Sequence, residues 1–169
     1  MDKKYFVVKN YLSADECDDY IALTRVLDPN PTLEVNLKRS RGPKAAKVNR
    51  TYWSIRSMTK HLRPLKALAE EKFGCSLKFS HAPKNYAHIM CYDVPGQGLE
   101  WHAEPNISTV SVSINLSNKW EYEGADFQMR DLPDLELNRG DAILYSGSWV
   151  HRVSDLVSGR KLSFVMWLK

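Results

Sequence analysis

The chain has 169 residues, of which 43% are hydrophobic, and a formal net charge of +4. This length is enough for one well-packed core and short for two, so we expect a single domain over residues 1–169. The net charge is too small by itself to indicate a nucleic-acid-binding protein.

The sequence also bears on the cellular compartment. The apolar run from Tyr5 to Val8 is far shorter than that of a signal peptide, and no later segment could span a bilayer. Cys17, Cys75 and Cys91 are widely separated and lack C-x-x-C spacing, which is typical of reduced, structural thiols. We therefore expect a cytoplasmic protein without membrane contact, and we assign the cysteines no function.

The first part of the chain, about residues 1–75, is predicted to be mainly helical with strands at its edges. A capping-box sequence from Ser13 to Glu16 precedes spaced apolar residues, which predicts a helix from about Ala14 to Val26. Apolar residues recur at helical spacing from Leu62 to Phe73, and Gly74 is placed to end that segment. These two helices are expected to support the rest of the fold.

A basic stretch separates the two predicted helices. Six Lys and Arg residues fall between Lys38 and Arg50, where neither helical nor strand periodicity is evident. We interpret this stretch as a loop. It could fold over a substrate, or it could be a solvated loop without a partner.

The second part, about residues 76–169, is predicted to be an antiparallel β structure. β-Branched and aromatic residues gather in short segments at Tyr86–Tyr92, Thr109–Leu116, Ala125–Met129, Ala142–Tyr145 and Leu162–Leu168. Within Thr109–Leu116, apolar residues alternate with Ser and Asn, so one face carries small polar groups that suit the lining of a ligand-binding barrel. Helices followed by strands indicate an α+β domain whose sheets form a sandwich or barrel.

Two histidines and one glutamate are the candidate catalytic metal ligands. His102 and Glu104 are two residues apart, which on an extended strand places both side chains on one face. His151, near the final strand, offers a third ligand. Such a set forms the facial triad of non-haem Fe(II) oxygenases, although zinc hydrolases can share it and an isolated H-x-E is frequent by chance. The ordered context of the three residues favours a metal site.

The sequence from Tyr92 to Trp167 resembles the prolyl 4-hydroxylase-like group of Fe(II)/2-oxoglutarate-dependent dioxygenases. The family pattern has a tyrosine, a glycine turn, H-x-D, a strand, a Gly-Gly turn, a glycine, H-x-V, and a basic residue before tryptophan. In this chain the elements are Tyr92, Gly96, His102-x-Glu104, Leu116-Ser117, Gly124-Ala125, Gly140, His151-Arg152-Val153, Gly159, Lys161 and Trp167. The resemblance implies a double-stranded β-helix, or cupin-like jelly roll, with supporting N-terminal helices.

The resemblance also implies roles for individual residues. His102, Glu104 and His151 would bind iron, Lys161 would pair with the far carboxylate of 2-oxoglutarate, and Tyr92 would hydrogen-bond this cosubstrate. We choose Lys161 over Arg160 because Lys161 shares a strand face with Trp167, where related enzymes place an inward aromatic residue. The implied reaction consumes O2 and forms succinate and CO2, with ascorbate as a further candidate cofactor.

Three positions depart from the family pattern. Glu104 stands where most relatives have aspartate, Asn115 where several prolyl hydroxylases have a tyrosine near the cosubstrate carboxylate, and Gly124-Ala125 where they have paired glycines. These departures affect inferences on the substrate more than inferences on the reaction.

The substrate expected from the resemblance is a prolyl residue in a peptide or protein, with Arg50 and Trp167 as candidate substrate contacts. One alternative is hydroxylation of a free amino acid or other small metabolite. Another is a non-catalytic, cupin-like metal-binding module, against which Lys161 argues because a metal site alone needs no buried cation. Nucleic-acid demethylation is disfavoured, because the last strand lacks the second arginine of such enzymes. The oligomeric state is not predicted.

Overall fold

The computed structural model describes residues 4–27, 29, 51–54, 59–80 and 86–169. Its helices and strands are, in chain order, β1 Tyr5–Val8, α1 Ala14–Val26, β2 Thr51–Ser54, α2 Thr59–Phe73, β3 Ala87–Tyr92, β4 Leu99–His102, β5 Val110–Asn115, the 3-10 helix η1 Lys119–Glu121, β6 Tyr122–Gly124, β7 Phe127–Met129, β8 Ala142–Ser146, β9 His151–Val153, β10 Leu156–Gly159 and β11 Lys161–Leu168. The predicted basic loop up to Arg50 lies outside the described residues.

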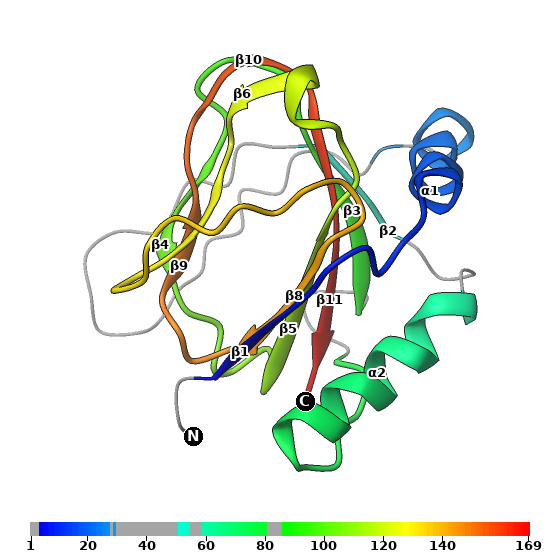
Figure 1. The fold of residues 1–169 in the computed structure, drawn as a ribbon, viewed down its shortest axis with the longest axis vertical. Helices are drawn as coiled ribbons and strands as arrows, with labels where there is room; N and C mark the ends of the chain where they lie inside the picture. The colour runs from blue at the N-terminus through cyan, green and yellow to red at the C-terminus, as the bar shows by residue number, and fades with distance from the viewer. Residues whose placement is uncertain (1–3, 28, 30–50, 55–58, 81–85) are drawn as a thin grey trace.

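The strands form three antiparallel sheets. The largest has six strands in the order β1-β8-β5-β11-β3-β2, the second has the order β4-β9-β7, and the third pairs β10 with β6. Both helices lie on one side of the six-stranded sheet, and the smaller sheets lie on its other side (Figure 1). The result is a β sandwich with helices packed on its outer face, as the sequence predicts.

Alternation along the strands of the large sheet separates a core face from a pocket face. On β11, the side chains of Leu162, Phe164 and Met166 belong to the hydrophobic core that the helices cover. The intervening residues Lys161 and Ser163 line a pocket between the sheets. The period of two along a strand therefore places a polar row directly behind an apolar one.

The helices differ little from those predicted. The Ser13 hydroxyl accepts a hydrogen bond from the Glu16 backbone N–H, and the Glu16 carboxylate accepts one from the Ser13 N–H, so the capping box is confirmed. Helix α2 ends before Gly74, whose φ of +66° is left-handed, but begins earlier than predicted, with Pro64 inside it. In the described part of the chain, we find no helix whose length and apolar character would let it cross a bilayer.

Candidate metal centre

His102, Glu104 and His151 converge on one point between the sheets. One potential ligand atom from each lies within 4.8 Å of the other two. The two histidines are direct partners in the antiparallel pairing of β4 with β9, and their ring centroids are 4.2 Å apart. Among the described residues, no second group of three His, Cys, Asp or Glu side chains has this geometry.

Glu104 does not lie on a strand, which corrects one detail of the sequence prediction. Strand β4 ends at His102, and the chain then turns, with the Glu104 carbonyl accepting hydrogen bonds from the N–H groups of Ile107 and Ser108. The Glu104 N–H donates to the Gly147 carbonyl at 2.7 Å. A Cβ on Gly147 would lie 2.2 Å from the Ser108 carbonyl oxygen, so glycine permits this close approach. The carboxylate is thus positioned by a turn rather than by strand alternation.

Backbone carbonyls orient both imidazoles. The Nδ1 atom of His102 lies 2.8 Å from the Glu100 carbonyl oxygen, and that of His151 lies 2.9 Å from the Trp149 carbonyl oxygen. A carbonyl can only accept, so we assign the proton of each ring to Nδ1. In the neutral form of each ring, Nε2 then carries the lone pair that a metal-binding imidazole requires.

The carboxyl group of Glu104 is ionised at neutral pH. Burial alone would raise its pKa, but the His102 and His151 rings and the Trp167 indole outweigh that effect and lower the pKa to about 2. The two imidazole rings and the Glu104 carboxylate face the same point. This donor set fits an Fe(II) ion with positions left for other ligands.

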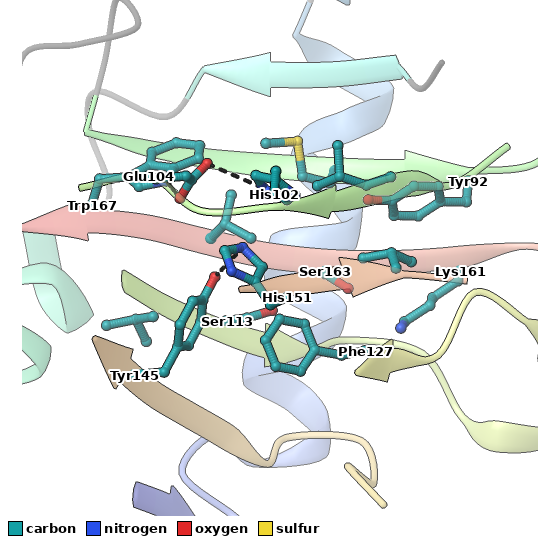
Figure 2. Close-up of a pocket in the computed structure, with 15 residues that line it drawn as sticks. Tyr92, His102, Glu104, Ser113, Phe127, Tyr145, His151, Lys161, Ser163 and Trp167 are labelled. Carbon is teal, nitrogen blue, oxygen red and sulfur yellow. Dashed lines mark hydrogen bonds and ion pairs between the residues drawn. The ribbon is translucent and has the colours of Figure 1, made fainter. Parts of the chain in front are cut away.

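A pocket extends from this centre between the sheets (Figure 2). Its polar lining residues besides the triad are Tyr92, Ser113, Tyr145, Lys161 and Ser163, and its apolar or aromatic lining residues are Met90, Leu99, Val112, Phe127, Val153, Val165 and Trp167. Figure 2 shows the Lys161 ammonium group at the opposite end of the pocket from Glu104. The pocket thus has a metal centre at one end and a cation at the other.

Lys161 is buried, with 5% of its surface exposed, whereas Arg160 is exposed. The Lys161 ammonium donates a hydrogen bond to the Ala125 carbonyl, and it lies 5.4 Å from the ring centroid of Tyr122. Among the described residues no carboxylate lies within salt-bridge distance of it, and burial lowers its pKa to about 8. Arg160 points away, as strand alternation predicts.

The other predicted site residues are placed as follows. Tyr92 is buried in the pocket, opposite Lys161 in the pairing of β3 with β11. Trp167 also lines the pocket, while Arg50 lies outside the described residues. Tyr86 and Trp149 belong to the hydrophobic core clusters and not to the pocket lining.

Tyr145 is a pocket residue that sequence reasoning missed. Its hydroxyl lies 3.2 Å from Nε2 of His151, and its ring packs edge-on against the same imidazole. Tyr145 lies on β8 among fully buried residues, so its sequence context gives no sign that it faces a ligand pocket.

Asn115 and Ala125, two of the departures from the family pattern, belong to the surroundings of Lys161. The Asn115 side-chain amide donates to the Tyr122 hydroxyl at 3.2 Å and to the Leu137 carbonyl at 2.8 Å. Ala125 has a left-handed φ of +48°. Asn115 therefore orients Tyr122, whose ring faces the Lys161 ammonium, and Ala125 supplies the carbonyl that accepts the hydrogen bond of this ammonium.

Comparisons with known proteins identify relatives. No family model matches the chain. A PKHD-type hydroxylase of Psychrobacter sp. strain PRwf-1 is 30% identical over 88 residues, which cover 44% of this chain and 34% of that protein. A PKHD-type hydroxylase of Prochlorococcus marinus strain MIT 9301 is 26% identical over 137 residues, covering 79% of this chain and 58% of that protein. The first match thus spans about a third of its relative's length, and the second spans less than two thirds.

Solved structures share the fold over nearly the whole chain. A Pseudomonas putida prolyl-4-hydroxylase superposes with a TM-score of 0.70 at 18% identity, covering 99% of this chain and 92% of the other. A viral collagen prolyl hydroxylase from Paramecium bursaria Chlorella virus-1, in its 2-oxoglutarate complex, has a TM-score of 0.68 at 15% identity, covering 97% and 94%. The chain therefore shares the fold of these prolyl hydroxylases, and parts of its sequence are similar to PKHD-type hydroxylases.

The shared fold confirms the predicted fold class, because 2-oxoglutarate-dependent Fe(II) oxygenases have a double-stranded β-helix core. The six-stranded sheet is one layer of that core, and β4, β9 and β7 form the opposite layer. In the dioxygenase fold of this chain, the three candidate ligands come from that opposite layer and the turn that follows β4.

Proposed function

We propose that this chain is an Fe(II)- and 2-oxoglutarate-dependent dioxygenase that hydroxylates a prolyl residue in a peptide or protein. The observation that carries the proposal is the pairing, within one pocket, of a two-histidine, one-carboxylate centre with the buried Lys161 ammonium. A metal-binding module would need the first feature but not the second. A dicarboxylate that chelates a metal through one end needs both.

His102, Glu104 and His151 are the residues that would hold Fe(II). When bound, the metal supplies activation of O2 coupled to decarboxylation of 2-oxoglutarate, with succinate, CO2 and a hydroxylated C–H position as products. The contribution of the three side chains is to present two Nε2 lone pairs and one carboxylate oxygen from fixed positions. Their hydrogen bonds to Glu100, Trp149 and Trp167 fix the orientation of each ligand.

Lys161 is the candidate for binding the far carboxylate of 2-oxoglutarate. Its present acceptor, the Ala125 carbonyl, is neutral, so its charge is available to an anion. A carboxylate would gain a charge-assisted hydrogen bond there in a site removed from water. Tyr92, its partner across β3 and β11, is placed beside this end of the pocket as a second hydrogen-bonding group.

The apolar side chains that line the pocket would exclude water from the reacting groups. Phe127, Val165 and Met90 are among the residues that line it. Burial of the cosubstrate among such side chains strengthens its polar contacts and protects reactive species from side reactions.

The relatives support a prolyl substrate. One sequence relative is named a PKHD-type hydroxylase, and the two solved structures are named a prolyl-4-hydroxylase and a collagen prolyl hydroxylase. The role of Arg50 in substrate binding stays a prediction.

The test is succinate formation from 2-oxoglutarate by protein loaded anaerobically with Fe(II) and then exposed to O2. Proline-containing peptides are compared with the same peptides carrying alanine in place of proline, with ascorbate present in all reactions. Peptide-dependent succinate that requires proline, with a mass gain of one oxygen in the peptide, supports the proposal. Stimulation only by free amino acids would instead establish a small-molecule hydroxylase.

His102→Ala and His151→Ala are the matched variants for this assay. Each substitution removes one candidate metal ligand, which lies on β4 or β9, and changes no residue of the main hydrophobic core. We therefore expect folded proteins without turnover. Wild-type succinate formation by either variant would contradict the assignment. No oxygen-dependent turnover by a protein shown to bind metal would favour the binding-module alternative.

Two further expectations accompany the proposal. Residues 1–169 act as one catalytic domain, because the first part of the chain supplies the helices that cover the sheet behind the pocket. All three cysteines are free, and two of them are buried, which fits a reducing compartment such as the cytoplasm.

A further inference from the structure

The two carboxylate oxygens of Glu104 have different surroundings. Oε1 faces the metal centre, 3.6 Å from Nε2 of His102. Oε2 accepts a hydrogen bond from the indole Nε1–H of Trp167 at 2.8 Å and a longer one from the Ser111 hydroxyl at 3.4 Å. One oxygen is therefore occupied by donors of the protein, and the other is presented to the site.

The two donors form a pair on the six-stranded sheet. Trp167 of β11 and Ser111 of β5 are direct partners in the antiparallel register, so their side chains leave the sheet side by side. Glu104 approaches from the opposite layer, after β4. The carboxylate thus bridges the two layers of the sandwich, and Figure 2 shows Trp167 against it.

The indole is itself held in place. Trp167 has 6% of its surface exposed, and the His88 ring packs edge-on against it with centroids 5.0 Å apart. The Ser111 hydroxyl is bonded to that of Ser108 at 2.7 Å. The Ser108 N–H also donates to the Glu104 carbonyl. The turn that positions Glu104 therefore also orients Ser111, which is one of the two donors to the Glu104 carboxylate.

Side-chain length connects this arrangement to the glutamate that replaces the usual aspartate. A glutamate carries its carboxylate one C–C bond, about 1.5 Å, further from the backbone than an aspartate does. From the backbone position of residue 104, that extra reach brings Oε2 to 2.8 Å from the indole nitrogen. An aspartate on the same backbone would fall short of a hydrogen bond with Trp167.

We propose that Trp167, assisted by Ser111, is a positioning residue that holds Oε2 of Glu104 so that only Oε1 is offered to the metal. Glu104 and Trp167 form a matched pair, in which the indole N–H fixes a longer and more mobile ligand. This inference rests on the proposed function, because it takes the triad to be a metal site. It differs from the sequence expectation, in which Trp167 contacts the substrate.

The test is a double-mutant cycle of Trp167→Phe and Glu104→Asp, with Co(II) affinity measured under anaerobic conditions by titration of its visible absorption. Phenylalanine keeps an aromatic ring and removes the N–H. Loss of a hydrogen-bonding partner behind a metal ligand typically weakens metal binding about 10- to 100-fold. We expect a loss of that order for Trp167→Phe in the wild-type background. In the Glu104→Asp background the change should be under about threefold, because no bond exists there to lose.

Trp53→Phe is the control variant. Trp53 is equally buried and its indole N–H also has a protein acceptor, the Leu27 carbonyl at 3.1 Å, but it lies on β2 away from the triad. Its Co(II) affinity should equal that of the wild type. Thermal melting of each variant separates a lost ligand contact from a lost fold.

A second measurement needs no Trp167 variant. The indole N–H resonance of Trp167 in a ¹⁵N-labelled protein should shift upfield in Glu104→Asp, because the hydrogen bond to a carboxylate is lost. An unchanged resonance overturns the argument from side-chain length.

The outcomes separate the inference from the proposed function. A wild-type protein that binds no Co(II) contradicts the metal site itself. A wild type that binds Co(II), with equal affinity in Trp167→Phe, contradicts only the positioning role. If Trp167→Phe changes the KM for the peptide and not the metal affinity, Trp167 acts on the substrate, and the inference is wrong.

Discussion

The Lys161 ammonium donates a hydrogen bond to the backbone carbonyl of Ala125, a residue with a left-handed φ of +48°. This carbonyl is neutral, so it orients the ammonium without cancelling its charge. Burial without a carboxylate partner is costly for a cation, and such residues are commonly functional. The geometry around Lys161 therefore leads to three testable consequences.

Loss of the Lys161 ammonium should weaken the binding of 2-oxoglutarate. A hydrogen bond to a charged group contributes about 1.5–3 kcal/mol, so Lys161→Ala should raise the KM for 2-oxoglutarate about 10- to 100-fold. Arg160→Ala is the control. Because Arg160 is exposed, the KM of this variant for 2-oxoglutarate should stay at the wild-type value. The reverse pattern in steady-state assays would transfer the role to Arg160.

The affinity for 2-oxoglutarate should depend on pH through Lys161. Burial lowers the pKa of Lys161 to about 8, so the free protein loses the ammonium as the pH rises above that value. We expect the dissociation constant of 2-oxoglutarate, measured by calorimetry with Mn(II) present, to increase above pH 8. In Lys161→Arg this increase should disappear, because an arginine stays charged. An equal increase in both proteins would assign it to another group.

The same pKa has a consequence for stability with a definite sign. The folded pKa of Lys161 is lower than the ordinary 10.5, so between about 8 and 10.5 the unfolded chain binds more protons than the folded one. The contribution of this group to the free energy of unfolding therefore increases with pH across that window. Lys161→Met should remove that part of the pH dependence in urea denaturation.

Ala125→Gly should stabilise the protein. An L-residue in the left-handed region costs about 1–2 kcal/mol, of which the extra flexibility of glycine in the unfolded chain offsets about 0.5–1 kcal/mol. We expect a net gain of about 0.5–1 kcal/mol in urea denaturation, with the KM for 2-oxoglutarate unchanged because the carbonyl acceptor remains. Ala87→Gly, in the buried strand β3, should destabilise the protein. A loss of stability in Ala125→Gly would mean that the Ala125 methyl group packs favourably.

Part of this site could be predicted from the sequence. The inward orientation of Lys161 follows from the period of two along a strand, and the polar row on β5 follows from the same rule, with Ser113 in the pocket. The ligand types and their order indicate the triad. These features depend on local patterns and on a resemblance whose motifs are close together in the chain.

Other features depend on contacts that no local pattern encodes. The pairing of His102 with His151 requires the register of β4 and β9, which is irregular between Leu99 and His102. The sequence does not predict strands β6 and β10, because they are short and contain Gly124 and Gly159, yet β6 leads to the carbonyl that holds Lys161. The hydrogen bond between Trp167 and Glu104 joins two layers, so only the assembled sandwich shows it.

Metal binding should stabilise the fold in a manner that requires His151. An ion that binds the folded chain alone contributes about 2.7 kcal/mol when its concentration is about 100 times the dissociation constant. For a chain of this length, such a gain raises the Tm by about 5–10 °C. We expect this rise with Mn(II) or Co(II) in differential scanning fluorimetry, and its reversal by EDTA.

The His151→Ala variant tests whether that rise comes from the triad. The His151 ring on β9 packs against the imidazole of His102. Replacing His151 by alanine therefore removes a candidate metal ligand and changes no residue of the hydrophobic core that the helices cover. The variant should melt at the same temperature with and without metal. A metal-induced rise of wild-type size in His151→Ala would show that the ion binds elsewhere. The triad would then lose its assigned role, although the fold and the Lys161 pocket would be unaffected.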